Sequence, residues 1–551
     1  MKKLLPIGID SFRKIRETDR YYVDKTMLIK EFIERGDEVA LITRPRRFGK
    51  TLNMTTIREF FDITADSKAI FDGLAVMGTD YAKQINTRPV IYFTFKDCKA
   101  NTEDVLLSLI SDVVLIEYQK YHAILKGAVD GSTGSYFTFF QTHEKLLNRN
   151  IDKFLLQISI KSLIVALSEY YGIKPIVLID EYDQPIMSSV EYGYHEDLKT
   201  FFSGFYGAAL KGQDCLHQAL LTGIQRIVKE SIFSQLNNIR VYTVADEAYS
   251  LHFGLDEQET GRLLSDYGLA LDGPVKQKYN GYIFGATEMY NPWSILYYAD
   301  TGTLADHWIN TSTNHLIRVS ISEADKFFRR DFDALINNGT VEVTADLECS
   351  FLELKHRDTL WGLLINSGYI TVTERINRDQ MKIRIPNGEV RSEFLRIIAD
   401  RANVQSRDLN KMFRCLLAWD MEGFMEVYQE IVLNCTSHHD AKENAYHMLF
   451  LGMCVSLNEM YKITSNIESG HGRSDIRLES LSPERPHIII EFKQGEDIDA
   501  LKEKALGQIM AQKYYQGLSG DVLCLGIAHD IKKCSYTYKM IESFSNNEIK
   551  L

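Results

Sequence analysis

The stretch RPRRFGKT at residues 44–51 decides the fold of the N-terminal part of the chain. It follows the apolar segment EVALIT (38–43), which predicts a strand, and it runs into TLNMTTIREFF from Thr51, whose spacing predicts an amphipathic helix. A P-loop uses this order of strand, turn and helix to point backbone N–H groups at phosphates. We therefore expect Gly49 and Lys50 to bind the phosphates of a nucleotide, and the Thr51 hydroxyl to bind Mg²⁺.

The loop departs from the usual P-loop at one position, because Arg44 stands where the first glycine is expected. Pro45 is a candidate for fixing the turn in its place, since the proline ring restricts φ. The two following arginines, Arg46 and Arg47, either touch phosphate or stay solvated, and Phe48 completes the loop. An ordinary basic loop is the alternative interpretation of the whole segment.

Two later strands carry polar residues that suit a nucleotide site. The run IVLIDE predicts a buried strand that ends in Asp180 and Glu181, of which the first would hold Mg²⁺ and the second would orient or deprotonate the attacking water. ALLTGIQR places Thr222 at the tip of another strand and Arg226 four residues later, where they would sense the terminal phosphate and neutralise developing charge. The alternative interpretations are that Asp180 and Glu181 only solvate the end of a strand, that Thr222 is a capping residue, and that Arg226 is a surface residue.

The order of the predicted elements indicates an α/β protein with three parts. Strands alternating with helical segments predict a mostly parallel sheet covered by helices in a first part at 1–290, which contains the P-loop. Residues 291–430 are predominantly helical with one hairpin signal, which suggests a helical lid with a winged-helix-like connector. At 431–551 a helix over 441–461, two strands, a helix and a last strand predict a separate α/β domain of order αββαβ.

A second candidate site lies in this last part, at Asp475, Glu491 and Lys493. If the two segments form an antiparallel hairpin around Pro483, Asp475 and Glu491 lie opposite each other. Two facing carboxylates repel unless a cation lies between them, so the pair predicts a divalent metal site. Lys493 projects on the same face as Glu491 and would orient the attacking water or stabilise the phosphate. A solvated hairpin face is the alternative.

Further motifs extend the pattern over most of the chain. They are LPIGIDSF (5–12), YVDKT (22–26), LIDEYDQPI (178–186), LTGIQR (221–226), ESIFSQLNN (230–238), YNGY (279–282) and YNPWSI (290–295). With RPRRFGKT they resemble the bacterial AAA-ATPase-like family, whose members carry a C-terminal domain of the PD-(D/E)XK nuclease superfamily.

The resemblance implies a P-loop NTPase that binds ATP and Mg²⁺ at Lys50, Thr51 and Asp180. It places YVDKT where contacts to the nucleotide base are often made, although Asp24 and Lys25 would equally form an internal ion pair. In the C-terminal domain, which would have the restriction-endonuclease-like fold, the implied metal ligands are Asp475, Glu491 and a third acid, Glu443, on the preceding helix. Gln508 on the following helix completes the implied site.

Composition sets the limits of these hypotheses. The 551 residues carry a formal net charge of −12, which argues against non-specific coating of nucleic acid but allows a local basic groove. Eight scattered cysteines without a C-x-x-C pair favour a reducing compartment, so we expect a cytoplasmic protein, and we expect no membrane segment.

The leading hypothesis is an ATPase coupled to a Mg²⁺-dependent nuclease acting on DNA or RNA. The rival is a nucleotide-gated nucleic-acid-binding or signalling protein with a non-cleaving nuclease fold. Assembly into a homo-oligomer through shared nucleotide sites is typical of such ATPases, and the sequence leaves the stoichiometry open.

Overall fold

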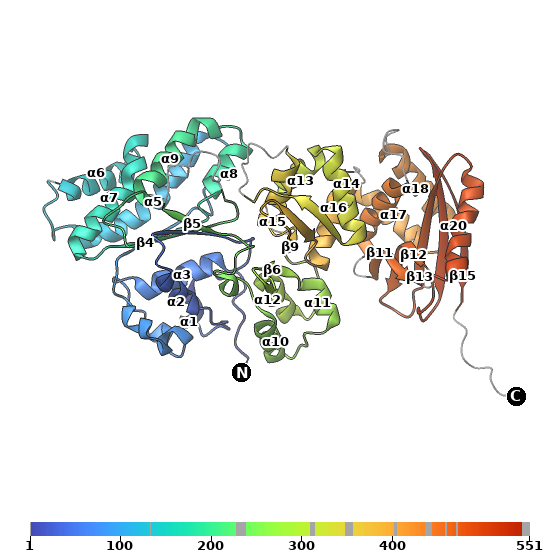
Figure 1. Cartoon of the computed structure of the whole chain (residues 1–551), viewed down its shortest axis with the longest axis horizontal. Coiled ribbons are helices and arrows are strands. Elements are labelled where there is room, and N and C mark those ends of the chain that lie inside the picture. Colours follow the sequence, from blue (N-terminus) through green and yellow to red (C-terminus); the bar gives the residue numbers. More distant parts are fainter. Residues whose placement is uncertain are drawn as a thin grey trace. The chain divides into compact units, whose positions relative to one another are not determined.

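The computed structural model describes residues 2–132, 134–226, 238–308, 314–347, 356–401, 405–435, 443–457, 460–469 and 472–542 (Figure 1). The chain divides into two compact units, of which the first comprises residues 1–329 and 341–388 and the second comprises residues 330–340 and 389–551. The three-part division at residues 290 and 430 stays a prediction. Each unit is described by itself below.

A five-stranded sheet forms the centre of the first unit. Its order is β2-β3-β4-β1-β5, and every neighbouring pair is parallel, which confirms the predicted parallel α/β sheet. The strands are β1 (Val39–Thr43), β2 (Val90–Thr94), β3 (Ile176–Asp180), β4 (Gln218–Gly223) and β5 (Ile239–Tyr242). Strands β1, β3 and β4 are buried throughout because both faces of the sheet are covered.

Helices cover both faces of this sheet, as Figure 1 shows. One group lies on one side and consists of α5 (Glu103–Leu125), α6 (Gly134–Leu147), α7 (Lys153–Tyr171), α8 (Gln184–Glu191) and α9 (His195–Leu210). The other side holds α1 (Phe12–Glu17), α2 (Met27–Arg35), α3 (Lys50–Phe61) and α4 (Lys68–Phe71). Because parallel strands all end at the same edge, the loops after β1, β3 and β4 meet there.

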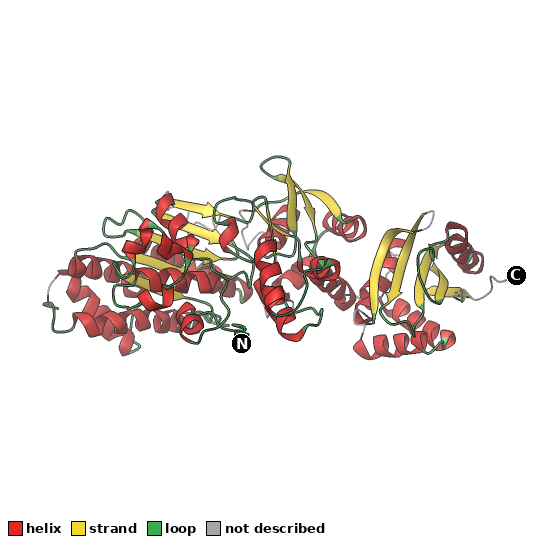
Figure 2. Ribbon diagram, turned by 90° about the horizontal axis from the view of Figure 1, so that it is seen from below, coloured by secondary structure: helices red, strands yellow, loops and turns green. Residues whose placement is uncertain are grey.

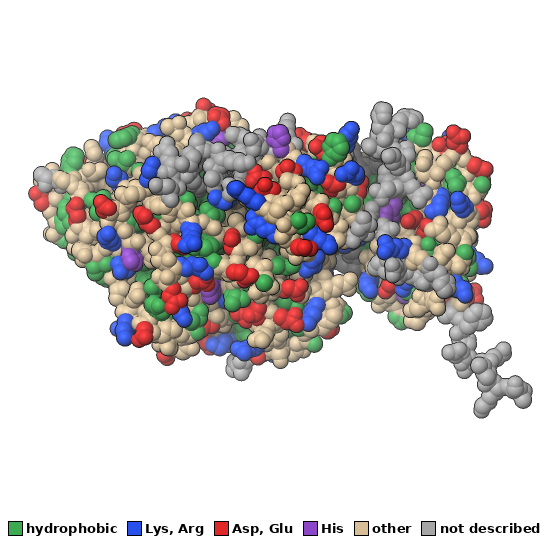
Figure 3. Space-filling view, viewed as in Figure 1, with side chains coloured by type: hydrophobic (Ala, Val, Ile, Leu, Met, Phe, Trp, Pro, Cys, Tyr) green, Lys and Arg blue, Asp and Glu red, His purple; other side chains and the backbone are tan. Residues whose placement is uncertain are grey.

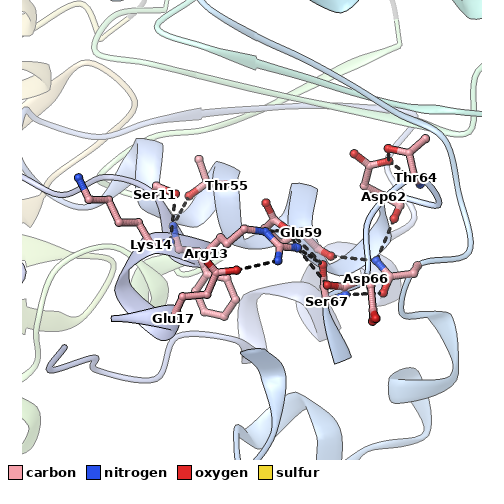
Figure 4. A network of polar contacts seen from close by, with 12 residues as sticks. Ser11, Arg13, Lys14, Glu17, Thr55, Glu59, Asp62, Thr64, Asp66 and Ser67 are labelled. Atoms are coloured by element: carbon pink, nitrogen blue, oxygen red, sulfur yellow. Dashed lines mark hydrogen bonds and ion pairs between the residues drawn. The ribbon is translucent and has the colours of Figure 1, made fainter. Parts of the chain in front are cut away.

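The N-terminal helix α1 is fastened to the P-loop helix α3 by a partly buried polar network (Figure 4). The Arg13 guanidinium donates to the Glu59 carboxylate at 2.6 Å, to the Ser67 hydroxyl at 3.0 Å and to the Asp66 carbonyl at 3.2 Å. The Ser11 side chain caps α1. Helix α1, which precedes the P-loop in the sequence, is therefore held against α3, the helix that follows the P-loop.

Helix α7 is long and apolar enough to span a membrane by length and composition. Half of its most apolar window is buried, and the helix packs against α6 and α9. A core helix of a globular domain has these same properties, so α7 is weak evidence for a membrane segment.

The remainder of the first unit is helical with two small sheets. The two-stranded sheet pairs β6 with β7, and the three-stranded sheet has the order β8-β10-β9. The elements are α10 (Glu257–Asp266), α11 (Gly273–Tyr279), β6 (Tyr282–Phe284), β7 (Thr287–Met289), α12 (Pro292–Thr301), α13 (Asn314–Glu323), β8 (Thr340–Thr344), α15 (Arg357–Asn366), β9 (Thr371–Arg375) and β10 (Gln380–Arg384). The hairpin that the sequence predicts is β9 and β10.

The second unit is built on a five-stranded sheet of order β11-β12-β13-β14-β15. Only β13 and β14 are parallel, and Figure 2 shows helices on both sides of the sheet. The strands are β11 (Tyr461–Ser469), β12 (Gly472–Ser480), β13 (His487–Gln494), β14 (Val522–Asp530) and β15 (Lys533–Ile541). The helices are α14 (Lys326–Asn338), whose residues 326–329 belong to the first unit, α16 (Gly388–Arg401), α17 (Ser406–Leu417), α18 (Met421–Cys435), α19 (Glu443–Met453) and α20 (Ile498–Gln512).

Two expectations for this unit are wrong. The helix predicted over 441–461 ends as α19 at Met453, a 3₁₀ turn follows at Cys454–Leu457, and Tyr461 already begins β11. The order is αβββαββ and not αββαβ, because β11 and β15 were not recognised as strands. Both are edge strands whose polar and apolar residues are mixed, so neither has the continuous apolar run of a central strand.

Candidate nucleotide and carboxylate sites

The P-loop closes around the ammonium group of Lys50. Gly49 adopts a left-handed conformation with φ of 83° and Arg47 one with φ of 67°, and α3 begins directly after them. Lys50 is buried and donates hydrogen bonds to the carbonyl oxygens of Arg44 and Pro45, both at 2.9 Å. Burial lowers the pKa of Lys50, and the charge of Glu181 opposes this effect. The loop has the strand, turn and helix context predicted for a P-loop.

Arg44 takes the place of the missing glycine by anchoring the loop to the sheet. Its guanidinium is completely buried and donates to the carbonyl oxygens of Thr43 at 2.8 Å, Tyr242 at 3.3 Å and Ala248 at 3.2 Å. Burial lowers its pKa to about 10. The residue therefore ties the start of the P-loop to the end of β5, so its side chain serves the fold.

Asp180, at the end of β3, lies at the centre of the predicted magnesium site. One of its oxygens accepts a hydrogen bond from the Thr51 hydroxyl at 2.6 Å, and the other accepts one from the Thr222 hydroxyl, also at 2.6 Å. The Thr94 hydroxyl of β2 is 3.4 Å away. The structure thus brings together three residues that the sequence separates by up to 171 positions. These oxygen donors are of the kind that Mg²⁺ prefers.

The next two acidic residues differ from each other in role. Glu181 has a positive φ of 52°, and burial together with the neighbouring Asp180 charge raises its pKa. Asp183 is buried and accepts backbone hydrogen bonds from Ile224 at 2.8 Å and Gln225 at 2.9 Å. Asp183 therefore holds the loop after β4.

The flanking loop residues have different surroundings. Arg46 is half-buried, which lowers its pKa, while the charges of Glu181 and Asp183 act in the opposite direction. Arg47 is exposed, and its guanidinium lies 4.0 Å above the ring of Trp293. Phe48 is fully buried, with its ring 4.9 Å from Tyr282. Because its side chain belongs to the core, a contribution of Phe48 to nucleotide binding has to come from its backbone.

Arg226 lies at a cavity of about 720 Å³. Asp246 lines the same cavity from the segment after β5, and Arg375 and Arg378 line it from the β9–β10 hairpin. The role predicted for Arg226 at the phosphates stays a prediction. The motif residues 230–237 lie outside the described residues.

The YVDKT motif lies beside the P-loop, but its two charged residues do not pair with each other. Asp24 accepts hydrogen bonds from the backbone N–H groups of Thr26 at 2.8 Å and Ala75 at 2.7 Å, whereas Lys25 pairs with Glu259 at 2.6 Å. The internal ion pair considered from the sequence is therefore wrong. A small apolar pocket of about 90 Å³ lies between this motif and the P-loop; it is lined among others by Tyr22, Val23, Lys25, Gly49, Leu255 and Leu296.

The second site forms where β12 and β13 separate. Ile476 pairs with Ile490 in the antiparallel register. Continuing this register by one residue places Asp475 opposite Glu491, as the sequence predicts. A Glu491 oxygen is 3.3 Å from the Asp475 backbone nitrogen, and Asp475 accepts a hydrogen bond from the backbone N–H of Phe492 at 2.8 Å. The two carboxylates therefore lie next to each other, as the hairpin hypothesis requires.

Glu491 is held by two side chains that the sequence predicts at this site. The Lys493 ammonium is 3.1 Å and the Gln508 amide 2.5 Å from the same Glu491 oxygen. Helix α20 approaches closely because Gly526, opposite Glu491, has no side chain: an added Cβ would lie 2.6 Å from the Lys502 carbonyl oxygen. Burial, and then the charge of Asp475, raise the pKa of Glu491 to about 7, and Lys493 only partly offsets this.

Two further residues at this site were not predicted as part of it. The Tyr514 hydroxyl accepts a hydrogen bond from the Gln508 amide at 3.1 Å, and the ring of this tyrosine is buried. His447 Nε2 lies 3.0 Å from the Asp475 carbonyl oxygen and 2.9 Å from the Ser465 hydroxyl. His447 thus contacts the backbone of the acidic strand. Its position in α19, one turn after Glu443, was the sequence signal; the side chain of Glu443 lies outside the described residues.

Comparison with known families finds two domains in the chain. Residues 6–233 match a family described as predicted AAA-ATPase, and residues 441–539 match the PD-(D/E)XK nuclease superfamily. The chain joins an AAA-ATPase-like domain to a PD-(D/E)XK domain. It is also 27% identical over 503 residues, which is 87% of each chain, to an uncharacterized protein in the vnfD 5′ region of Azotobacter chroococcum mcd 1.

The PD-(D/E)XK domain offers a donor set that fits a divalent cation. Asp475 and Glu491 supply carboxylate oxygens; burial raises the pKa of both groups, and the charge of Asp475 raises that of Glu491 further. Among the described residues, no group of three or more His, Cys, Asp or Glu side chains that could hold a metal ion is found. The carboxylates of Asp475 and Glu491 are the described candidate ligands, and they suit Mg²⁺ because this ion retains several waters.

Proposed function

We propose that the chain binds and hydrolyses ATP in its AAA-ATPase-like domain and uses the nucleotide state to control Mg²⁺-dependent cleavage of nucleic acid phosphodiesters in its PD-(D/E)XK domain. The observation that carries this proposal is the pair of carboxylate sites, each with hydroxyl or amine partners suited to a metal and a phosphate. Asp180 with Thr51 forms one of them, and Asp475 with Glu491 and Lys493 forms the other.

At the nucleotide site, each residue has a task that its contacts support. Phosphate oxygens would compete with the Arg44 and Pro45 carbonyls for the Lys50 ammonium, which is already confined to the loop. Thr51 and Asp180 would hold Mg²⁺, which when bound neutralises phosphate charge. Glu181 has a raised pKa and lies beside this group, so it is suited to accept a proton from the attacking water.

At the PD-(D/E)XK site, Asp475 and Glu491 would hold Mg²⁺, which when bound polarises the phosphate and its water ligands. Lys493 lies within hydrogen-bonding reach of Glu491, so it is placed to orient a water or stabilise negative charge that develops on the phosphate. Gln508 and Tyr514 keep Glu491 in one orientation through two successive hydrogen bonds. These groups are of the kind that metal-dependent hydrolysis uses, which supports the proposal.

The test is cleavage of labelled single- and double-stranded DNA and of RNA by the purified full chain with Mg²⁺. We expect cleavage that is lost in Asp475→Ala and Lys493→Ala. Glu503→Gln is the matched control, because Glu503 is exposed on α20 and should leave cleavage unchanged. Equal cleavage by the wild type and the two site variants would assign the activity to a contaminant and refute a nuclease.

The same residues suit a second candidate function. The Lys493 ammonium beside Glu491 is placed to contact a phosphate whether or not the bond is cut, so the domain would also suit a protein that binds nucleic acid without cutting it, gated by the nucleotide. This alternative predicts tight, salt-dependent binding and no cleavage with any divalent metal. Filter binding at several salt concentrations, run beside the cleavage assay, separates the two candidates.

The proposal also covers the middle part of the chain, the assembly of its copies, its location and the place of the nucleotide base. We propose that residues 291–430 act as a helical lid and winged-helix-like connector, and that copies of the chain assemble through their nucleotide sites. We further propose a cytoplasmic location, since no cysteine among those described forms a disulfide and several are buried. The small apolar pocket beside Gly49 is the proposed place for part of the nucleotide base.

A further inference from the structure

The loop after β4 is held by hydrogen bonds on two sides. On one side Thr222 donates to Asp180, and Asp183 accepts from the backbone N–H groups of Ile224 and Gln225. The Gln225 carbonyl oxygen accepts a hydrogen bond from the Tyr182 hydroxyl at 2.6 Å. A movement of the Asp180 segment therefore changes the position of Gln225.

The side chain of Gln225 continues this network to a different part of the same unit. Its amide oxygen accepts a hydrogen bond from Asn366 at 3.0 Å, and its amide nitrogen donates to the Ser367 hydroxyl at 3.1 Å. Asn366 also donates to the Leu347 carbonyl at 3.1 Å. Gln225 and Asn366 are almost fully buried, so each lost hydrogen bond leaves a polar group without water. Such an arrangement is costly to break and is suited to transmit a displacement.

Helix α15 connects the network to the next element. Asn366 is its last residue, and Trp361 in its middle is buried with its ring 4.4 Å from that of Phe328. Phe328 belongs to the first turn of α14, whose residues 326–329 lie in the first unit and whose later residues lie in the second. The contacts thus run from the Asp180 carboxylate to a helix that the two units share along the chain.

We propose that Gln225 is a positioning residue that couples the nucleotide state at Asp180 and Thr222 to helix α15. The inference rests on the proposed ATP binding and deepens it, because it names the contacts through which nucleotide binding affects residues outside the P-loop. It assigns a task to a residue that the site hypotheses leave without one. Asn366 is the residue of α15 that contacts Gln225 and through which this coupling reaches the helix.

The test is hydrogen–deuterium exchange of the full chain with and without ATP and Mg²⁺. In the wild type we expect slower exchange in three segments: 44–51, 218–225 and 357–367. For the last segment we expect a change of at least about fivefold, the lower end of typical coupling between sites. In Asn366→Ala, protection of 44–51 and 218–225 should persist while that of 357–367 is lost. Asn377→Ala, in the exposed β9–β10 turn, is the matched control and should behave like the wild type.

Protection of 44–51 and 218–225 in the wild type without protection of 357–367 would overturn the coupling and leave ATP binding intact. Retained protection of 357–367 in Asn366→Ala would overturn it as well. Absence of protection at 44–51 would instead overturn the proposed ATP binding itself. If Asn366→Ala fails to fold, Gln225→Met provides the second variant, since it keeps the side-chain length and removes the hydrogen bonds of the side-chain amide. It should lower kcat for ATP hydrolysis about tenfold with KM changed less than about twofold.

Discussion

The raised pKa of Glu491 predicts that the PD-(D/E)XK site binds metal in competition with protons. Its pKa is raised to about 7, so about a tenth of the glutamate is ionised at pH 6 and about nine-tenths at pH 8. Because the carboxylate is the metal ligand, the affinity for Mg²⁺ should rise about tenfold between these pH values. Without metal, the protonated form stabilises the folded state, and this stabilisation is present below pH 4.5 and is lost as pH rises through about 7.

The size of the stability effect follows from the same shift. Raising the pKa from its ordinary 4.5 to about 7 corresponds to about 3 kcal/mol of unfolding free energy between low and high pH, as an upper value. The assay is isothermal titration with Ca²⁺ or Mg²⁺ at pH 6, 7 and 8, together with urea unfolding in EDTA. Asp475→Asn should abolish the metal signal and lower the pKa of Glu491, because it removes the second cause of the shift. Glu503→Gln is the control.

Two results would refute this reasoning. The first is a metal affinity that does not change between pH 6 and pH 8 in the wild type. The second is metal binding that survives in Asp475→Asn, since the two carboxylates then do not form one site.

Three further predictions concern the AAA-ATPase-like domain. Lys50→Ala should lose the stabilisation that ATP gives in a thermal-shift assay, about 2.7 kcal/mol at ATP one hundred times its Kd, and an unchanged shift would place ATP elsewhere. Asp183→Ala should lower the unfolding free energy by about 2 to 3 kcal/mol in urea, because two backbone N–H groups lose their acceptor; a change below about 0.5 kcal/mol would contradict this. Arg13→Ala should cost about 1 to 3 kcal/mol in the same assay, as it leaves the largely buried Glu59 without its cation, and equal stability would show that α1 is not held by this pair.

The parallel sheet and the convergence of the candidate nucleotide-site residues followed from local patterns. The strand before Gly49 and the strand that ends at Asp180 are continuous apolar runs, and strands that end at one edge bring their terminal residues together. The antiparallel register of Asp475 and Glu491 followed from their equal distance to the turn. In each case a short sequence signal and a simple geometric rule were sufficient.

Other features depend on contacts that sequence spacing does not encode. The anchoring of Arg44 by carbonyl oxygens around β5 needs the three-dimensional position of Tyr242 and Ala248. The pairing of Lys25 with Glu259 joins residues 234 positions apart, so the nearer Asp24 was the natural candidate. Edge strand β15 carries mixed polar and apolar residues and is recognised only by its pairing with β14.

The central claim is that nucleotide bound at Lys50 controls cleavage at Asp475. Its most direct test is the single-turnover cleavage rate of one nucleic acid substrate with Mg²⁺, measured without nucleotide, with ATP and with a non-hydrolysable ATP analogue. The account predicts a rate that differs between these states in the wild type, a nucleotide-independent rate in Lys50→Ala, and no cleavage in Asp475→Ala. A wild-type rate that is the same in all three states, with cleavage still dependent on Asp475, would contradict the coupling.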